Sequence, residues 1–281
     1  MDPLVSTEWL ANEIGADDLR VLDASNHLPD AGRDARAEYD AGHIPGAAFL
    51  DLASLVDTNS PVPSALPRPE QFAARMQALG VGDGSRIVIY DDSEVKTAAR
   101  AWFMLTMFGA RNVAILDGGL AKWKAEGRPL DTGEPASRQR HFTARPDDAK
   151  VRGKAQVLAN IDSRAEQLVD AREAGRFTGE VPDFRPGIQS GHIPGSHSLP
   201  FTELYNDDGT FKHAASLRAA FEDAGIDLSR PVVTTCGGGV TAAALSFAMH
   251  LLGKDDTALY DGSWSEWAAD PATPKALGPA E

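Results

Sequence analysis

Short apolar runs alternate with amphipathic segments along the whole chain. The runs are rich in Val, Ile and Leu and are too short for helices, which predicts strands. Amphipathic segments between them predict helices, such as the one at 69–79, where Pro69 opens the first turn and Gly80 follows the end. The predicted strands cover 20–22, 86–90, 113–116, 167–169, 232–235 and 257–260. Strict alternation of this kind predicts an α/β fold with mainly parallel sheets flanked by helices.

The second half of the chain repeats motifs of the first half. A stretch rich in Pro, Gly, Arg and Asp separates the halves and reads as a linker. We therefore expect domains at 1–127 and 154–281, joined by a linker at 128–153. The repeated motifs are Leu22-Asp23-Ala24 and Val169-Asp170-Ala171, His43-Ile44-Pro45-Gly46 and His192-Ile193-Pro194-Gly195, and Asp117-Gly118 with Trp123 and Asp261-Gly262 with Trp267.

Cys236 is the only cysteine of the chain, and it lies where an apolar strand meets a glycine loop and a helix, in VVTTCGGGVTA. Lone cysteines are usually small buried hydrophobes. Consecutive glycines before a helix instead favour a reactive thiolate, because loop N–H groups and the helix dipole then face the sulfur. The later repeats share an offset of 144 residues (261 − 117), which places Asp92 at the cysteine position of the first half. The chemistry is therefore expected in the second half alone.

Charge and composition exclude several function classes. The 281 residues carry a formal net charge of −14, so we expect neither nucleic acid nor an anionic membrane as a partner. The apolar run at 101–108 is far too short to span a bilayer, and residues 1–6 do not resemble a signal peptide. A single cysteine excludes an intrachain disulfide and fits a cytoplasmic location. An anionic substrate would need a local cluster of positive charge.

Features that occur in both halves are expected to be structural, since one half lacks the thiol. His43 and His192 are therefore predicted to form packed corners rather than catalytic bases. Ser263 and Glu266 have the spacing of a capping box at the start of the last helix. No set of Cys and His residues suggests a metal site.

These motifs together resemble the tandem rhodanese-type sulfurtransferases, which have an inactive N-terminal copy and an active C-terminal copy. The resemblance covers nearly the whole chain, including Gly32-Arg33-Asp34-Ala35-Arg36 and Asp261-Gly262-Ser263-Trp264. It implies two tandem rhodanese-like domains and sulfur transfer through a persulfide on Cys236, with no metal or organic cofactor. The resemblance also implies that the outer sulfur lies among the N–H groups of Gly237, Gly238, Gly239, Val240 and Thr241.

The loop residues bear on the identity of the sulfur donor. Thiosulfate-using members of the family tend to carry Arg and Lys after the cysteine, whereas 3-mercaptopyruvate-using members tend to carry Gly and then Ser or Thr. This chain has Gly237 and Gly238, and the absence of two cations favours 3-mercaptopyruvate over thiosulfate. Arg176 and Arg185 match the arginines that hold the mercaptopyruvate carboxylate and carbonyl in that subfamily.

The chain departs from the subfamily at a proposed Ser–His–Asp set. The corresponding positions are Gly238, Ser64 and Ala53, so that set cannot operate here. The donor therefore stays open between 3-mercaptopyruvate and thiosulfate. The implied acceptor is a thiol, cyanide or a thioredoxin-like protein.

Two other function classes compete with this interpretation. A cysteine phosphatase needs an arginine six residues after the cysteine, and that position is Ala242, which argues against it. A non-catalytic persulfide carrier remains an alternative, because the Ser–His–Asp positions are substituted.

Overall fold

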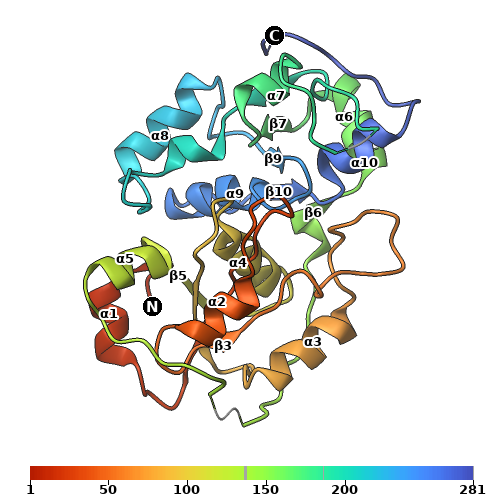
Figure 1. Ribbon diagram of the computed structural model, residues 1–281. Coiled ribbons are helices and arrows are strands. Elements are labelled where there is room, and N and C mark those ends of the chain that lie inside the picture. The colour runs from red at the N-terminus through yellow and green to blue at the C-terminus, as the bar shows by residue number, and fades with distance from the viewer. Residues whose placement is uncertain (136–137, 186, 281) are drawn as a thin grey trace. The chain divides into compact units, whose positions relative to one another are not determined.

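The computed structural model describes residues 1–135, 138–185 and 187–280, which form two compact units. The first unit comprises Met1–Asp57, Leu66–Asp147 and Asn206–Phe211. The second comprises Thr58–Ala65, Asp148–Tyr205 and Lys212–Glu281. In Figure 1 the chain colour runs from red in the first unit to blue in the second.

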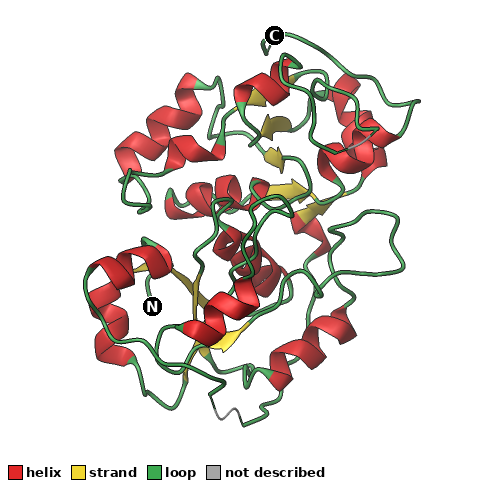
Figure 2. Ribbon diagram, viewed as in Figure 1, coloured by secondary structure: helices red, strands yellow, loops and turns green. Residues whose placement is uncertain are grey.

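The first unit contains a five-stranded parallel sheet in the order β1-β5-β4-β2-β3. Figure 2 shows its strands flanked by helices. Its elements are β1 (Leu4–Val5), α1 (Thr7–Glu13), β2 (Leu19–Asp23), α2 (Ala35–Ala41), β3 (Ala48–Phe49), α3 (Pro69–Ala78), β4 (Arg86–Tyr90), α4 (Thr97–Met107), β5 (Asn112–Leu116) and α5 (Gly119–Ala125).

The second unit repeats this arrangement with the strand order β6-β10-β9-β7-β8, again wholly parallel. In Figure 1, β10, β9 and β7 follow one another across the unit. Its elements are η1 (Asp148–Lys150), β6 (Val151–Arg152), α6 (Lys154–Ser163), β7 (Gln167–Asp170), α7 (Ala174–Thr178), β8 (Ser196–Ser198), η2 (Phe201–Leu204), α8 (Ala214–Asp223), β9 (Val232–Thr235), α9 (Ala242–Leu251), β10 (Thr257–Tyr260) and α10 (Ser263–Ala269).

The structure confirms the α/β fold, the parallel sheets and all six predicted strands, with their ends shifted by at most one residue. The pattern missed β1, β3, β6 and β8, which are two or three residues long. Such short edge strands show no measurable alternation, because a period of two needs at least four positions. One of them, β6, lies in the segment predicted as a linker and pairs with β10.

The central strands are buried on both faces, which explains their continuous apolar runs. Every residue of β9 and of β10 is buried, and helix α9 covers them with a face of Ala, Leu, Phe and Met side chains. Across the described residues, no helix is both long and apolar enough to pass through a bilayer.

The sheet order decides which residues meet at the carboxyl edge of the second unit. β9 lies between β7 and β10, so the ends of all three strands lie side by side. The three strands end at Thr235, Asp170 and Tyr260. The residues that follow these ends form the candidate site, as expected for ligand sites of parallel sheets.

Candidate active site

Cys236 follows β9 directly and is 2% exposed. The chain then turns through Gly239, whose φ of +79° suits glycine, and α9 begins at Ala242. The Gly239 N–H donates to Cys236 Sγ over 3.1 Å. The predicted strand, loop and helix around the thiol are therefore present, with one loop amide pointing at the sulfur.

The other loop residues continue from the thiol to the helix. Gly237 and Gly238 are half-buried, as are Val240 and Thr241, and Thr241 is the N-cap of α9. The helix has no acidic residue in its first turn. Its dipole therefore acts on the loop without a compensating carboxylate.

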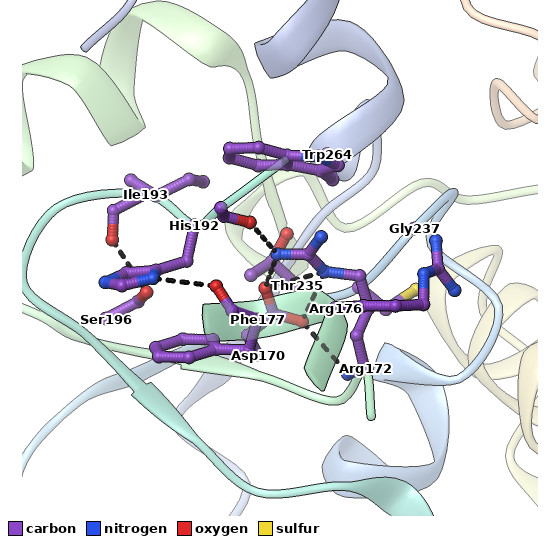
Figure 3. Close-up of polar contacts among 12 residues, drawn as sticks. Asp170, Arg172, Arg176, Phe177, His192, Ile193, Ser196, Thr235, Gly237 and Trp264 are labelled. Carbon is purple, nitrogen blue, oxygen red and sulfur yellow. Dashed lines mark hydrogen bonds and ion pairs between the residues drawn. The ribbon is translucent and has the colours of Figure 1, made fainter. Parts of the chain in front are cut away.

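Both arginines singled out from the sequence lie against the first loop glycine. A Cβ built on Gly237 would be 3.5 Å from an Nη atom of Arg176 and 3.5 Å from one of Arg185. Arg176 comes from helix α7, and Arg185 from the loop that follows it. The local positive charge that an anionic substrate would need is thus present beside the cysteine loop; Figure 3 shows Arg176 reaching toward Gly237.

One carboxylate, which was not predicted from the sequence, holds both guanidinium groups. Asp183 accepts from Arg176 Nη2 at 2.6 Å and from Arg185 Nε and Nη2 at 2.8 Å each. Its side chain is only 2% exposed. Burial raises the pKa of Asp183, but the hydrogen bonds from Arg185 and Arg176 outweigh burial and hold that pKa well below its usual range. Asp183 is therefore a fixed negative charge at neutral pH.

The two arginines differ in how many donors they have left. Arg185 also donates from Nη1 to the Gly237 carbonyl at 2.8 Å and contacts Ser265 Oγ. Arg176 Nε, by contrast, is buried and has no hydrogen-bond acceptor among the described residues. A buried donor without an acceptor is costly, so an anionic ligand beside it would be stabilised.

The first turn of α10 fastens the cysteine loop. Ser263 Oγ accepts from the Cys236 N–H at 3.2 Å, and Trp264 N donates to the Cys236 carbonyl at 3.0 Å. Ser265 donates to the Gly237 carbonyl from its N–H at 2.9 Å and from its hydroxyl at 2.5 Å. Three consecutive residues thereby fix the peptide groups on either side of the cysteine.

The capping box predicted for Ser263 and Glu266 is wrong. Gly262 is the N-cap of α10 and makes no side-chain cap, because Ser263 is already in the helix. Ser263 has a φ of +49°, and its hydroxyl donates to the Tyr260 carbonyl at 2.8 Å. Glu266 Oε2 accepts from the Tyr260 hydroxyl at 2.9 Å instead of reaching back along the backbone.

A buried ion pair supports this turn from the neighbouring strand. Arg172 and Asp170 are 2% and 1% exposed, and their closest atoms are 2.6 Å apart. The Arg172 guanidinium also donates to the Gly191 carbonyl at 2.8 Å and lies 4.6 Å from the Trp264 ring centroid. Figure 3 shows Arg172 between Asp170 and Trp264, so β7 and α10 are linked through one cation.

The first unit shows which residue the other copy has at the position of the cysteine. By strand register Asp91, and not the predicted Asp92, stands at the position of the cysteine, because Tyr90 pairs with Asp23 as Thr235 pairs with Asp170. Arg33 donates to the carboxylate of the next residue, Asp92, at 3.1 Å and to its carbonyl at 2.9 Å. Lys124 lies 3.8 Å from the same carboxylate. Two cations of the first unit are therefore paired with Asp92, directly after the position of the cysteine.

Among the described residues, the loop that carries Asp183 and Arg185 has no counterpart in the first unit. In both units an aromatic ring stacks on the histidine of the repeat, and the histidine Nδ1 bonds the carbonyl of that aromatic residue. Tyr39 and His43 are 4 residues apart, whereas Phe177 and His192 are 15 apart. The additional eleven residues (15 − 4) form the arginine-bearing loop. Both histidines are almost fully buried, which confirms the packed corners.

The three substituted family positions are spread over both units. Ala53 is an exposed residue of the first unit, while Ser64 and Gly238 belong to the second. Ser64 Oγ would lie 3.0 Å from a Cβ built on Gly238. A serine hydroxyl therefore lies over the loop at the position where this chain lacks one.

An α/β unit that presents a cysteine at the end of a central strand, in a loop leading to a helix N-terminus, is suited to covalent catalysis by a thiolate. A family model described as "Rhodanese-like domain" matches residues 6–126 and 154–270. The chain belongs to the rhodanese-like family and carries two copies of its domain.

The chain is 43% identical over 270 residues to the 3-mercaptopyruvate sulfurtransferase of Mus musculus, covering 94% of this chain and 91% of the relative. It is also 43% identical over 274 residues to the thiosulfate sulfurtransferase of Cricetulus griseus, with the same coverage. The crystal structure of SseA from Escherichia coli, a 3-mercaptopyruvate sulfotransferase, matches with a TM-score of 0.86 at 38% identity. That match covers 94% of this chain and 99% of SseA.

Proposed function

We propose that this protein is a sulfurtransferase that moves a sulfur atom from 3-mercaptopyruvate to an acceptor through a persulfide on Cys236. Relatives with names of this activity cover nearly the whole chain. Relatives named for thiosulfate are equally similar, so overall identity does not distinguish the two donors. The choice of donor rests on the charges beside the loop.

The choice between the two donors rests on one observation: the side chains beside Gly237 carry a single net positive charge. Arg176 and Arg185 supply two guanidinium groups, and Asp183 between them supplies one carboxylate. The loop itself adds no charge. One net cation matches a single carboxylate better than the two negative charges of thiosulfate. The unpaired Arg176 Nε is a donor that such a carboxylate or the neighbouring carbonyl would satisfy.

The first transfer is a displacement at sulfur. The Cys236 thiolate attacks the donor sulfur, an S–S bond forms, and the bond between that sulfur and carbon breaks. The carbon leaves as an enolate, which the arginines stabilise, and the proton of the donor thiol ends on that carbon to give pyruvate. Cys236 is left as an anionic persulfide, whose outer sulfur faces the amides of residues 237–241.

The second transfer regenerates the thiolate. A thiolate, cyanide or a reduced thioredoxin-like protein attacks the outer sulfur, the S–S bond breaks, and Cys236 leaves as a thiolate. No charge or atom is left over in the cycle. We place this cycle in the cytoplasm, in keeping with the lone reduced cysteine.

We assign catalysis to residues 154–281, with a linker at 128–153 and an inactive copy at 1–127. This division is supported by Asp91, which occupies the cysteine position of the first unit and cannot form a persulfide. It is also supported by the arginine-bearing loop, which occurs in the second unit alone among the described residues.

The test measures both donors with the same acceptor. Pyruvate release from 3-mercaptopyruvate and sulfite release from thiosulfate are followed with cyanide, for the unchanged protein and for Cys236→Ser. We expect 3-mercaptopyruvate to be the better donor by kcat/KM and Cys236→Ser to abolish both reactions. A large preference for thiosulfate would show that the charge argument is wrong.

A persulfide carrier without efficient turnover is the second candidate, because the family's Ser–His–Asp positions are Gly238, Ser64 and Ala53 here. Intact-mass measurement after donor treatment separates it from an enzyme. A carrier would gain one sulfur on Cys236 but release no more pyruvate than one equivalent per chain.

A further inference from the structure

Ser263 has a backbone conformation that its residue type disfavours. Its φ of +49° lies in the left-handed region, which L-residues other than glycine rarely adopt. Among the described residues, two further non-glycine residues have positive φ, Lys96 and Arg164, and neither is buried. Ser263 has no exposed surface at all. Strain that persists at a buried position points to a specific requirement for the side chain.

The Ser263 hydroxyl has two short contacts that define its role. It donates to the Tyr260 carbonyl at 2.8 Å, which orients its lone pairs toward the cysteine loop. It then accepts the Cys236 N–H at 3.2 Å. This amide belongs to the residue that bears the sulfur, so the contact fixes the backbone from which Sγ projects.

The first unit shows that the backbone there does not need a serine. The equivalent residue at the offset of 144 is Gly119, with a φ of +57°. By strand register the cysteine position of the first unit is Asp91, and the amide of the next residue, Asp92, is bonded by Ser25 Oγ at 3.0 Å. In the second unit the position of Ser25, two residues after the strand-end aspartate, is occupied by Arg172, which is paired with Asp170. Among the described residues, a serine with positive φ therefore stands at this position in the second unit alone.

We propose that Ser263 is a positioning residue for Cys236: its hydroxyl holds the Cys236 amide so that Sγ stays directed at the loop N–H groups. The inference rests on the proposed function in its use of Cys236 as the nucleophile. The arginines that would hold the donor do not contact Ser263. Its loss should therefore lower the rate of attack by Cys236 while leaving donor affinity unchanged.

Two variants separate the hydroxyl from the backbone strain. Ser263→Gly removes the hydroxyl and suits the φ of +49°, whereas Ser263→Ala removes the hydroxyl and keeps the strain. Ser196→Ala is the matched control: Ser196 is a buried serine of the same unit, and its Oγ donates to the Ile193 carbonyl at 2.7 Å. Like Ser263, it bonds the carbonyl three residues earlier, and Figure 3 shows it beside Ile193. Among the described residues, none of its hydrogen bonds goes to Cys236.

Two measurements are made on each full-length variant. The first is kcat and KM with 3-mercaptopyruvate. The second is the rate of Cys236 alkylation by iodoacetamide as a function of pH, which needs no donor and no turnover. We expect both Ser263 variants to lose about 10-fold in kcat and in alkylation rate, the effect of one lost hydrogen bond on a reacting group, with KM within about twofold. Ser196→Ala should match the unchanged protein in both measurements.

The outcomes decide the proposal independently of the donor. If alkylation and kcat of Ser263→Gly stay within about twofold of the unchanged protein, the serine is structural and the proposal is wrong. If KM rises while alkylation is unaffected, Ser263 acts on the donor and the proposal is also wrong. If the unchanged protein turns over no donor, the proposed function fails, but the alkylation rates still test Ser263.

Discussion

Replacing Asp183 by Asn tests whether one buried charge determines which donor the site accepts. The substitution keeps the shape of the side chain and removes the negative charge shared by Arg176 and Arg185. The retained amide oxygen can still accept from the Arg185 backbone N–H and Nε, which now bond Oδ1 at 3.0 and 2.8 Å. The new NH₂ group would face Arg176 Nη2, and two hydrogen-bond donors cannot bond each other. We therefore expect Arg176 to be released first.

The structure sets the size of the expected changes. Removing one partner of a buried charge pair costs about 3–5 kcal/mol. The two guanidinium groups are 18% and 25% exposed, so solvent screens part of this and we expect a loss of about 2 kcal/mol in unfolding free energy. Loss of one charge-assisted contact to the donor carboxylate should raise KM for 3-mercaptopyruvate by about 10-fold or more. The site meanwhile gains one net positive charge, which favours a dianion.

The decisive quantity is the ratio of kcat/KM for thiosulfate to kcat/KM for 3-mercaptopyruvate. A unit charge about 5 Å from the donor is worth about 3 kcal/mol at an effective dielectric constant of 20, and solvent reduces this to about 1 kcal/mol. The ratio should therefore rise by about five- to tenfold in Asp183→Asn. The assay is the pair of donor reactions already described, run at low ionic strength and repeated with added salt.

Glu166→Gln is the control for stability. Glu166 forms a comparable ion pair with Arg152 in the same unit, with both side chains about one-fifth exposed. It precedes β7, whereas the cysteine loop follows the other end of the neighbouring strand. The Glu166→Gln variant should be less stable than the unchanged protein but should react equally well with both donors. If Asp183→Asn lowers kcat/KM equally for both donors, the reasoning from charge is wrong. If its kinetics are identical to those of Glu166→Gln, Asp183 has only a structural role.

Two further predictions follow from other parts of the structure. Gly238→Ser should lower the melting temperature, because its Cβ would lie 3.0 Å from Ser64 Oγ. Adding Ser64→Ala should recover most of the lost stability. Strictly additive effects of the two substitutions on stability would contradict the contact. Burial raises the pKa of Asp91 to about 6, so the stability due to its protonated form is fully present below about pH 4 and is lost as pH rises through 6. When the pH is lowered from 7.5 to 5.5, the unfolding free energy measured by urea titration should therefore increase by about 1 kcal/mol. Asp91→Asn should flatten this pH dependence. An unchanged slope in the variant would assign the effect to other groups.

The sequence predicted those parts of the fold that repeat a pattern over several residues. Buried strands such as β9 are continuous apolar runs, and the helix at 69–79 is delimited by Pro69 and Gly80. The strands of two or three residues were missed because they are defined by pairing with a neighbour, not by their own composition. The predicted capping box failed for a related reason: Ser263 bonds a residue 27 positions away, and spacing within one helix cannot show that.

The site was predicted in its charged and reactive residues but not in what holds them. Cys236, Arg176 and Arg185 carry chemistry that is rare or conspicuous in an acidic chain, and the structure brings the two guanidinium groups to the loop glycine that follows Cys236. Asp183 lies in sequence between the two arginines, which was an available signal. In a chain with 41 acidic residues, however, one more aspartate does not stand out. Its importance appears only once burial and three short contacts are known.

The eleven-residue difference between the two repeats has a consequence for how this protein can change. Arg185 and Asp183 lie in a segment outside the sheet, between α7 and the His192 corner. The described part of the first unit has the same order of five strands without such a segment. Under the proposed function, the arginines that hold the donor therefore lie in an added segment, whereas Cys236 directly follows a central strand. Recombination or design could exchange this loop to alter the accepted donor, while Cys236 and the turn that fastens it stay as they are.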